Sequence, residues 1–440
     1  MPHPDVIVSS QPFWFRDGWI TTWIRYISSH SSSQTDKMPS KKTQDAPETI
    51  GKLARDFTAK LSELEQTNLE DLAQSFSHLC SDGARFDIAA DRFLDFADRL
   101  AQAGMFSAFE FDEETLNSKT SIAALAQGLR GVRATRCGPI ENAVADLSDA
   151  IRSPLLSPEA RSFFRLHKTM TEEELGLTEF AKINYEILAA EDTLYAKQAC
   201  YWRSYLAYGS EGRFREVLQT LCMIPASTGS CLDIRKFLLQ GDVYRVNARF
   251  DEAEKAYTQA LHYAKQSEAR GLEGRALTQL AETLCWIRPQ AGRHIAHKAI
   301  ERTRQDGNKI DEFRAHTALA IANTGTKPAL VVEQSLQTAE RLCKASGTRT
   351  GKGRLLTGLV FHAAHTKDRK MLTANLAQSE RMANALGDTD FWGDIFRTWA
   401  DTTRGSISSS QAESQWLDSR EHTMQRWRQV LHTRQNYRAD

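Results

Sequence analysis

The stretch RKFLLQGDVYRVNARFDEAEKAYTQA, residues 235–260, has the pattern of two short helices joined by a tight turn. In each expected helix, three residues at helical spacing share one face: Phe237, Gly241 and Tyr244 in the first, and Ala253, Tyr257 and Ala260 in the second. Residues 247–249 form a short polar break, and acidic residues follow Phe250, where a helix dipole favours them. Small residues allow two helices to approach closely, so the stretch predicts an antiparallel helical hairpin.

These six residues resemble the tetratricopeptide repeat (TPR), in which aromatic and small residues recur at fixed offsets. Gln240 stands where this repeat usually has Leu, and Lys265 stands where it usually has a closing Pro. Without that proline the second helix can continue, so we expect a period longer than the usual ~34 residues. The resemblance implies an all-α fold, a right-handed α-solenoid of TPR-like helix-turn-helix repeats with a helical N-terminal region.

The downstream sequence has a period close to 40 residues in two independent registers. Gly307, Gly347 and Gly387 lie 40 residues apart, each after a helical run, which is the usual place for a helix-ending glycine. The second register is a set of residue pairs at spacings of 39, 40 and 40: Leu280-Ala281, Leu319-Ala320, Leu359-Val360 and Trp399-Ala400. Weaker matches extend upstream, and TPR-like repeats are predicted over residues 196–405.

Three further regions flank these repeats. Residues 1–45 combine an aromatic amphipathic segment with a Ser-rich linker. They are interpreted as a disordered tail or an over-called start before Met38, as an interfacial membrane helix, or as a helix that docks on the solenoid. Residues 46–195 are expected to be helical, either degenerate repeats, a bundle or a cap, with breaks at residues 81–83, 138–139 and 153–154 and a helix through Phe180, Ile183, Ile187 and Leu188. Residues 406–440 predict a C-terminal capping helix with a basic face, which alternatively contacts nucleic acid or an acidic partner.

Composition excludes several classes of protein. The 56 basic and 56 acidic residues balance, whereas a nucleic-acid-binding protein usually carries a basic excess. No run of apolar residues reaches the ~18 that a membrane span requires. Seven scattered cysteines without a CxxC pair argue against structural zinc and a disulfide framework, so we expect a cytoplasmic protein.

A ladder of arginines provides the candidate binding residues. Arg235, Arg275, Arg314 and Arg354 recur at spacings of 40, 39 and 40, and three of them carry a threonine three residues later, namely Thr278, Thr317 and Thr357. In TPR proteins these offsets point into the concave groove, where guanidinium groups could bind carboxylates or phosphates in bidentate fashion. Matching offsets add Asp242, Arg245, Glu282, Trp286, Phe361 and His365. The alternative is that each arginine pairs with an acid on a neighbouring helix and holds the repeats together.

No catalytic residue, metal site or cofactor site is predicted. His294 with His297, and His362 with His365, have the spacing of paired metal ligands, but no Cys, Asp or Glu is obviously placed to complete either site. Residues 347–353 resemble a phosphate loop only faintly, because the spacing is one residue short and a helix precedes it.

The function expected from these patterns is a non-catalytic scaffold whose concave groove binds a protein or a peptide, with acidic groups that the arginines could hold. A peptide-responsive regulator is the alternative, because a helical region followed by long TPR-like repeats resembles bacterial signal-peptide sensors. A helical enzyme without a recognisable motif is the third hypothesis.

Overall fold

The computed structural model describes residues 68–85, 88–191, 195–206, 231–246 and 249–386, together with positions 57, 193, 217–219 and 221. The chain divides into two units, Met1–Ser62 and Glu63–Asp440, and every helix named below belongs to the second. The predicted segments 1–45 and 406–440, as well as Gly387 and Trp399-Ala400, lie outside the described residues. The described part is all-α, as predicted: no β-strand occurs in it. None of the helices described is long and apolar enough to cross a lipid bilayer.

Helices of unequal length precede the regular hairpins. These are α3 (Leu69–Arg85), α4 (Asp91–Gln102), the 3-10 helix η2 (Phe106–Ala108) and α5 (Glu113–Asn117). Phe76 of α3 packs edge-on against Phe109, with ring centroids 5.7 Å apart, and both side chains are fully buried. The predicted break at residues 81–83 is wrong, because α3 continues through it. Gly83 is needed there for packing: a Cβ would lie 2.5 Å from the Phe93 ring and 2.8 Å from Ile122.

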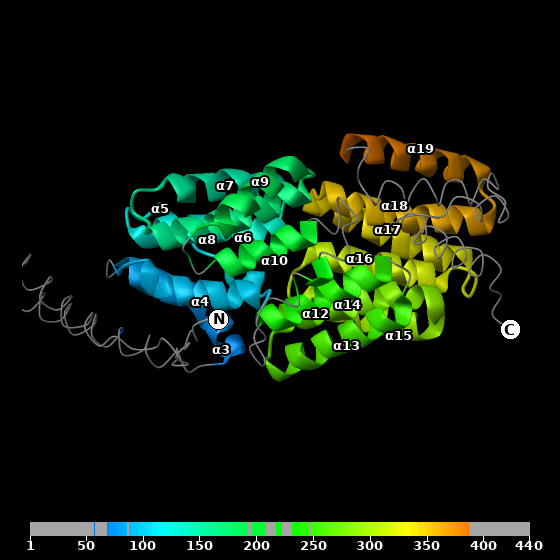
Figure 1. Ribbon diagram of the computed structural model, residues 1–440, viewed down its shortest axis with the longest axis horizontal. Coiled ribbons are helices and arrows are strands. Elements are labelled where there is room, and N and C mark those ends of the chain that lie inside the picture. Colours follow the sequence, from blue (N-terminus) through cyan, green and yellow to red (C-terminus); the bar gives the residue numbers. More distant parts are fainter. Residues whose placement is uncertain are drawn as a thin grey trace, which may run out of the picture. The chain divides into compact units, whose positions relative to one another are not determined.

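Antiparallel helix pairs then follow in chain order (Figure 1). The first helices of the pairs begin 35 to 40 residues apart: α6 (Ser121–Cys137), α8 (Pro158–Glu174), α10 (Ala196–Leu206), α12 (Cys231–Val246), α14 (Arg270–Ile287), α16 (Lys309–Asn323) and α18 (Arg349–Thr366). Their partners within the described residues are α7 (Ile140–Arg152), α9 (Thr178–Ala189), α13 (Phe250–Gln266), α15 (Pro289–Gln305), α17 (Ala329–Ser346) and α19 (Arg369–Leu386). The helix pairs therefore begin at Ser121, whereas the sequence pattern predicted repeats only from residue 196 onward.

The stretch that predicted the fold forms the α12–α13 hairpin. The expected break falls between Val246 and Phe250, and α13 continues to Gln266 in the absence of the closing proline. A Cβ on Gly241 would lie 2.4 Å from the ring of Tyr257, so glycine allows the buried tyrosine to pack directly on the backbone of α12. Phe237 and Tyr263 stack across the same hairpin with centroids 5.6 Å apart.

Local capping sets the ends of the regular helices. Asn308 and Thr348 accept hydrogen bonds from the backbone N–H groups of Asp311 and Gly351, and so begin α16 and α18. Gly307 and Gly347 have φ values of 66° and 74°, which side chains other than glycine rarely adopt. The predicted role of these two glycines at helix ends is thus confirmed.

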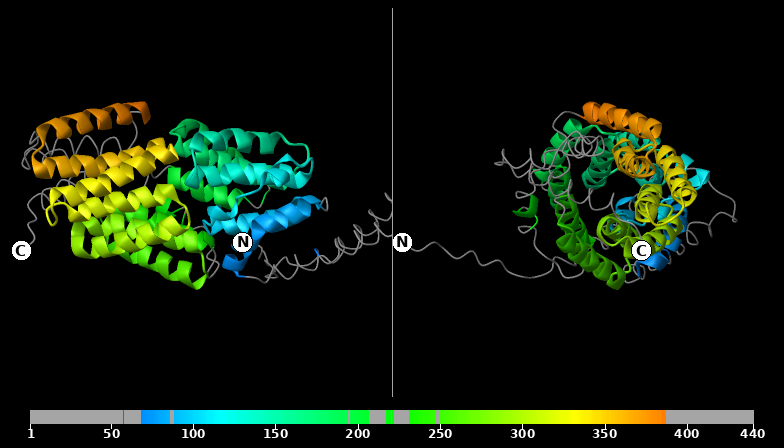
Figure 2. Two further views of the ribbon diagram at one scale, coloured as in Figure 1. Left: turned by 180° about the vertical axis from the view of Figure 1, so that it is seen from behind. Right: turned by 90° about the vertical axis from the view of Figure 1, so that its right-hand side faces the viewer.

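Contacts between helices join successive hairpins. The first helix of one hairpin contacts the first helix of the next, from α12 to α14, α16 and α18, and we call these the inner helices. The second helices, here called outer helices, fill the spaces between them, as the views in Figure 2 also show. Leu359 packs against a cluster containing Ala320 and Leu336, so the recurring Leu-Ala positions meet between successive hairpins.

Candidate functional site

Glu282 accepts hydrogen bonds from two arginines of the ladder, Arg314 and Arg354, which belong to two other inner helices. Arg275, Arg314 and Arg354 are each the sixth residue of their helix, and Glu282 lies about two turns after Arg275 on α14. Arg314 of α16 donates to both carboxylate oxygens of Glu282, with Nε–Oε1 and Nη2–Oε2 distances of 2.9 and 2.8 Å. Arg354 of α18 donates from Nη1 to the same two oxygens at 3.1 and 3.0 Å. One carboxylate therefore links α14 to the inner helices of the next two hairpins.

Asp242 of α12 extends this network. Its Oδ1 accepts hydrogen bonds from the Tyr257 hydroxyl at 2.7 Å and from Arg245 Nη2 at 3.0 Å, and its Oδ2 accepts one from Gln279 at 2.8 Å. Arg245 Nη2 also lies 3.7 Å from Glu282 Oε2, which joins the two carboxylates into one network.

Electrostatics hold the centre of this network in the charged state. Burial alone would raise the pKa of Glu282, but the guanidinium groups of Arg314, Arg354 and Arg245 outweigh burial and hold that pKa well below its usual range. Asp311 contributes a third carboxylate, 3.0 Å from Arg314 Nη1. Three arginines thus face three carboxylates, Asp242, Glu282 and Asp311, so these six side chains carry no net charge together.

The three predicted threonines donate hydrogen bonds to their own helices. The hydroxyls of Thr278, Thr317 and Thr357 contact the carbonyl oxygens of Gly274, Phe313 and Gly353, four residues earlier, at 2.9, 2.9 and 3.2 Å. Thr278 and Thr317 are buried, and only Thr357 is partly exposed. These three hydroxyls thus donate hydrogen bonds to backbone carbonyl groups.

Arg235 and Arg275 share a contact with Trp202 of α10. Arg235 Nη2 donates to the backbone oxygens of Ala101 and Gln102 at the end of α4, at 3.1 and 2.9 Å. Both guanidinium groups lie over the ring of Trp202 on α10, 5.5 and 6.0 Å from its centroid. Burial lowers the pKa of Arg235 to about 10. Arg314 and Arg354 therefore hydrogen-bond to a carboxylate, whereas Arg235 and Arg275 lie over an indole ring. The charge of Arg275 also acts to lower the pKa values of Glu173 and Glu174.

A second acidic cluster joins the end of α8 to the start of α18. Glu174 pairs with Arg136 of α6, 2.7 Å from Oε1, while its Oε2 accepts hydrogen bonds from the hydroxyls of Thr348 and Thr350, both at 2.9 Å. The carboxylate occupies the N-terminus of α18, where the helix dipole favours an anion. Segments more than 170 residues apart in sequence are fastened together at this point.

The neighbouring Glu173 has the opposite electrostatic environment. Burial, and then the charge of Glu174, raise the pKa of Glu173 to about 8, although Arg136 and Arg275 act against this shift. The Tyr185 hydroxyl donates to its Oε2 at 3.2 Å. Sequence analysis missed these residues. The signal was a run of three glutamates in the last turn of a helix, where the dipole disfavours acids.

The remaining predicted residues extend the inner surface along α14 and α18. Trp286 and Phe361 are buried and meet edge-on, with ring centroids 5.3 Å apart, while His365 is partly exposed one turn beyond Phe361. His362 is buried, with Nε2 3.7 Å from a carboxylate oxygen of Glu333 on α17. Within the described residues no three His, Cys, Asp or Glu side chains converge as metal ligands would.

Repeated helix pairs with polar and aromatic residues on their inner helices define a TPR-like α-helical repeat protein. No protein-family model matches the sequence, and the search of curated proteins found no match. Among solved structures, the chain is similar to the crystal structure of a Rap protein complexed with competence and sporulation factor. The alignment covers 81% of this chain and 84% of that chain, with 12% sequence identity and a TM-score of 0.37.

Proposed function

We propose that this protein is a non-catalytic scaffold that binds a peptide or a protein segment on the inner helices α12, α14, α16 and α18. The observation that carries the proposal is the Glu282 network, which joins successive inner helices and still reaches solvent, since the Arg354 side chain is 20% exposed. An apolar contact would hold the hairpins together as well, because a buried ion pair is often no more stabilising than packed hydrophobic residues. A polar inner wall instead gives directional groups for recognition.

A carboxylate-bearing ligand fits this wall best. Glu282 retains the bidentate contact with Arg314 if Arg354 turns to an incoming carboxylate, so binding does not leave Glu282 unpaired. Trp286 and Phe361 lie along the same two helices, α14 and α18.

The test uses the full chain and a library of synthetic peptides of about 5–15 residues, which is the scale of an extended segment crossing several helices. Peptides that bind are expected to raise the melting temperature, because a ligand that binds only the folded state stabilises it. Arg354→Ala is expected to abolish that shift, whereas Arg341→Ala, an exposed arginine on the outer helix α17, is the matched control. Equal shifts in Arg354→Ala and wild type would contradict the proposed site. A change in peptide mass during incubation would contradict the absence of catalysis.

A peptide-responsive regulator is the second candidate function. It is favoured by the Glu174 contacts, which tie α8 to α18, and by Arg235, which ties the inner helix α12 to α4. A ligand on the inner helices would act on these contacts. Hydrogen exchange distinguishes the candidates: a regulator changes the protection of the α8 and α18 ends when peptide binds, and a passive scaffold changes only the contacted helices.

The setting that we propose is the cytoplasm, where thiols stay reduced. In the described part of the chain, Cys80, Cys137 and Cys343 are buried free thiols. Alkylation of the protein at the moment of cell lysis is expected to label all accessible cysteines, and protection by disulfides would contradict this setting.

A further inference from the structure

The outer helix α9 exposes a strip of large apolar side chains. Phe180, Ile183 and Ile187 have exposed fractions of 66%, 55% and 55%, and Leu177 just before the helix is 42% exposed. The helical spacing that predicted this helix is confirmed, but only Leu188 of the predicted stripe is buried. Single exposed apolar residues are ordinary, whereas several on one face of one helix mark an interaction surface.

Helix geometry places this strip between the buried face and the charged face of α9. At 100° per residue, the buried residues Ala181, Tyr185 and Leu188 share one face of α9, and Glu179 and Lys182 lie on another. Phe180, Ile183 and Ile187 lie between these faces, on the side of Asn184. The strip from Leu177 to Ile187 is about 15 Å long, at 1.5 Å per residue, which corresponds to nearly three helical turns.

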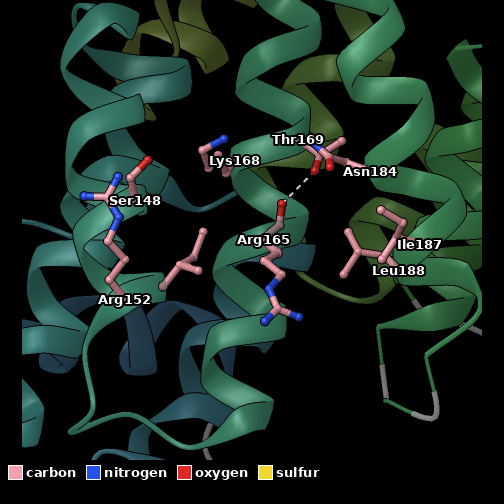
Figure 3. Close-up of a pocket in the computed structure, with 9 residues that line it drawn as sticks. Ser148, Arg152, Arg165, Lys168, Thr169, Asn184, Ile187 and Leu188 are labelled. Atoms are coloured by element: carbon pink, nitrogen blue, oxygen red, sulfur yellow. Dashed lines mark hydrogen bonds between the residues drawn. The ribbon is translucent and has the colours of Figure 1, made fainter.

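A cleft adjoins the strip on the Asn184 side. It lies between α7 and α9 with α8 as its floor and has a volume of about 240 Å³. Figure 3 shows Ile187 and Leu188 on one side of it, Arg165, Lys168 and Thr169 from α8 in the middle, and Ser148 and Arg152 from α7 on the other side. Ile151 completes the apolar part of the lining. Strip and cleft form one continuous surface, because Ile187 belongs to both.

The cleft presents three cations to solvent, and the carboxylate partners of two of them are more deeply buried than the cations. Its charged lining residues are Arg152, Arg165 and Lys168, and no acid is among the lining residues. Arg165 is 47% exposed but its partner Glu191 only 21%, and Lys168 is 26% exposed but its partner Glu172 only 10%. Arg152 is 78% exposed, and its partner Asp149, which does not line the cleft, is 57% exposed. An incoming partner therefore meets positive charge on this side of the apolar strip.

We propose that this outer surface docks an amphipathic helix of a partner protein, with the apolar face of that helix on Phe180, Ile183 and Ile187 and an acidic flank over the α7–α9 cleft. A helix of two to three turns covers the strip, and helices commonly bind grooves through apolar residues at i, i+3, i+4 and i+7. This surface uses none of the inner-helix residues of the proposed function, so the two can be tested independently.

The probes are two labelled synthetic helices of roughly four turns with the same leucine stripe, one with glutamates on one flank and the other with lysines in their place. Fluorescence polarisation with the full chain is expected to show tighter binding of the glutamate helix, and its affinity is expected to fall as salt is added. Equal or tighter binding of the lysine helix, or no binding of either probe, would overturn the proposal.

Variants locate the binding on α9. The double substitution Phe180→Ser and Ile187→Ser is expected to weaken the glutamate helix by tenfold or more, because each residue would lose the burial of a large apolar side chain. Both positions are exposed, so the fold is expected to tolerate the changes. Leu330→Ser on α17, where the leucine is 64% exposed, is the matched control and is expected to leave the affinity unchanged. Equal losses in the double variant and in the control would contradict docking on α9.

Two further measurements test the role of the charge in the cleft and the identity of the partner that covers the strip. Arg152→Glu is expected to weaken the glutamate helix several-fold and to strengthen the lysine helix, and an unchanged preference would refute the acidic flank. Light scattering tests whether a second copy of this chain covers the strip instead. A wild-type dimer that becomes monomeric in the Phe180→Ser, Ile187→Ser variant would replace the proposed partner by self-association.

Discussion

Substituting Glu282 by glutamine should be among the most destabilising isosteric changes in this protein. Glutamine keeps the shape of the side chain but removes the charge and places an NH₂ donor where a carboxylate oxygen accepts hydrogen bonds. The change affects four hydrogen bonds, two from Arg314 and two from Arg354. It also shifts the summed charge of the six network side chains from zero to one positive charge. The surrounding arginines are mostly buried, so this charge is poorly screened.

The expected loss follows from the burial of the remaining partners. The Arg314 side chain is 5% exposed and Arg245 is 7% exposed. Removing one member of a buried ion pair typically costs about 3–5 kcal/mol, because the other charge stays buried and uncompensated. Asp311 and Asp242 still contact Arg314 and Arg245, which places the loss toward the lower end, at about 3 kcal/mol. A total stability of about 5–15 kcal/mol would be reduced by a substantial fraction.

The assay is urea unfolding of the full chain, followed by far-UV circular dichroism and by tryptophan fluorescence. Two probes are needed because long repeat arrays can unfold in steps. Glu340→Gln on the exposed side of α17 is the matched control and should change stability by no more than about 0.5 kcal/mol. The double substitution Glu282→Gln, Arg354→Met restores the charge balance and should recover at least ~1 kcal/mol relative to Glu282→Gln alone.

The pH dependence of the same variant has a defined sign. Because the folded-state pKa of Glu282 is depressed, its stabilising contribution is fully present above the ordinary carboxyl pKa and is lost as pH falls through the folded value. The stability difference between wild type and Glu282→Gln should therefore stay constant from neutral pH to about pH 5 and shrink in stronger acid. A loss below ~1 kcal/mol at neutral pH, or a double variant no more stable than the single one, would refute the hub role of Glu282.

Three other substitutions give distinct expectations. Gly271→Ala would place a Cβ 2.1 Å from the backbone oxygen of Gly104, and since backbone cannot rotate away as a side chain can, thermal unfolding should show a loss of at least ~2 kcal/mol. Gly241→Ala should cost less, about 1–2 kcal/mol, because the clashing atom belongs to the ring of Tyr257, which has some freedom to shift. In the wild type, the folded-state pKa of Glu173 is about 8, so between pH 5 and pH 8 the folded state keeps a proton that the unfolded state releases. The free energy of unfolding therefore falls as pH rises, by up to ~1.4 kcal/mol per pH unit. Glu173→Gln should remove this decline. Melting temperatures of wild type and variant across this range check the last expectation.

The repeat fold could be predicted from the sequence because its determinants are local and periodic. Gly307 and Gly347 end helices through their own backbone conformation, and Gly241 admits Tyr257 from within the same hairpin. Gly83 shows the limit of local rules. Ser-Asp-Gly is a common turn sequence, yet here the glycine makes room for Phe93 and Ile122, and that reason lies in another helix.

The candidate site could be predicted only in part, because the partners of its residues also lie in other helices. Equal spacing places Arg235, Arg275, Arg314 and Arg354 at equivalent positions of successive helices, but the partner of each depends on what the neighbouring segments supply. Arg314 and Arg354 meet Glu282 because α14 carries an acid two turns after Arg275, whereas Arg235 donates to backbone carbonyl groups at the end of α4. Backbone carbonyls have no sequence signature, and α4 lies more than 130 residues away from Arg235.

The inner helices around Glu282 and the outer surface of α9 differ in how their charges are arranged, and this difference favours separate binding roles for the two surfaces. Each charged group of the Glu282 network has a partner of opposite sign, so the network has no net charge. A ligand there gains contacts mainly by replacing existing ion pairs and by close fit. Beside α9 the carboxylate partners of Arg165 and Lys168 are less exposed than these two cations, and the apolar strip carries no polar groups to exchange. A partner therefore gains both burial of apolar area and attraction to the positive charge that lines the cleft. Raised salt should therefore weaken the outer contact much more than the inner one, because exposed charges are screened and buried pairs are not.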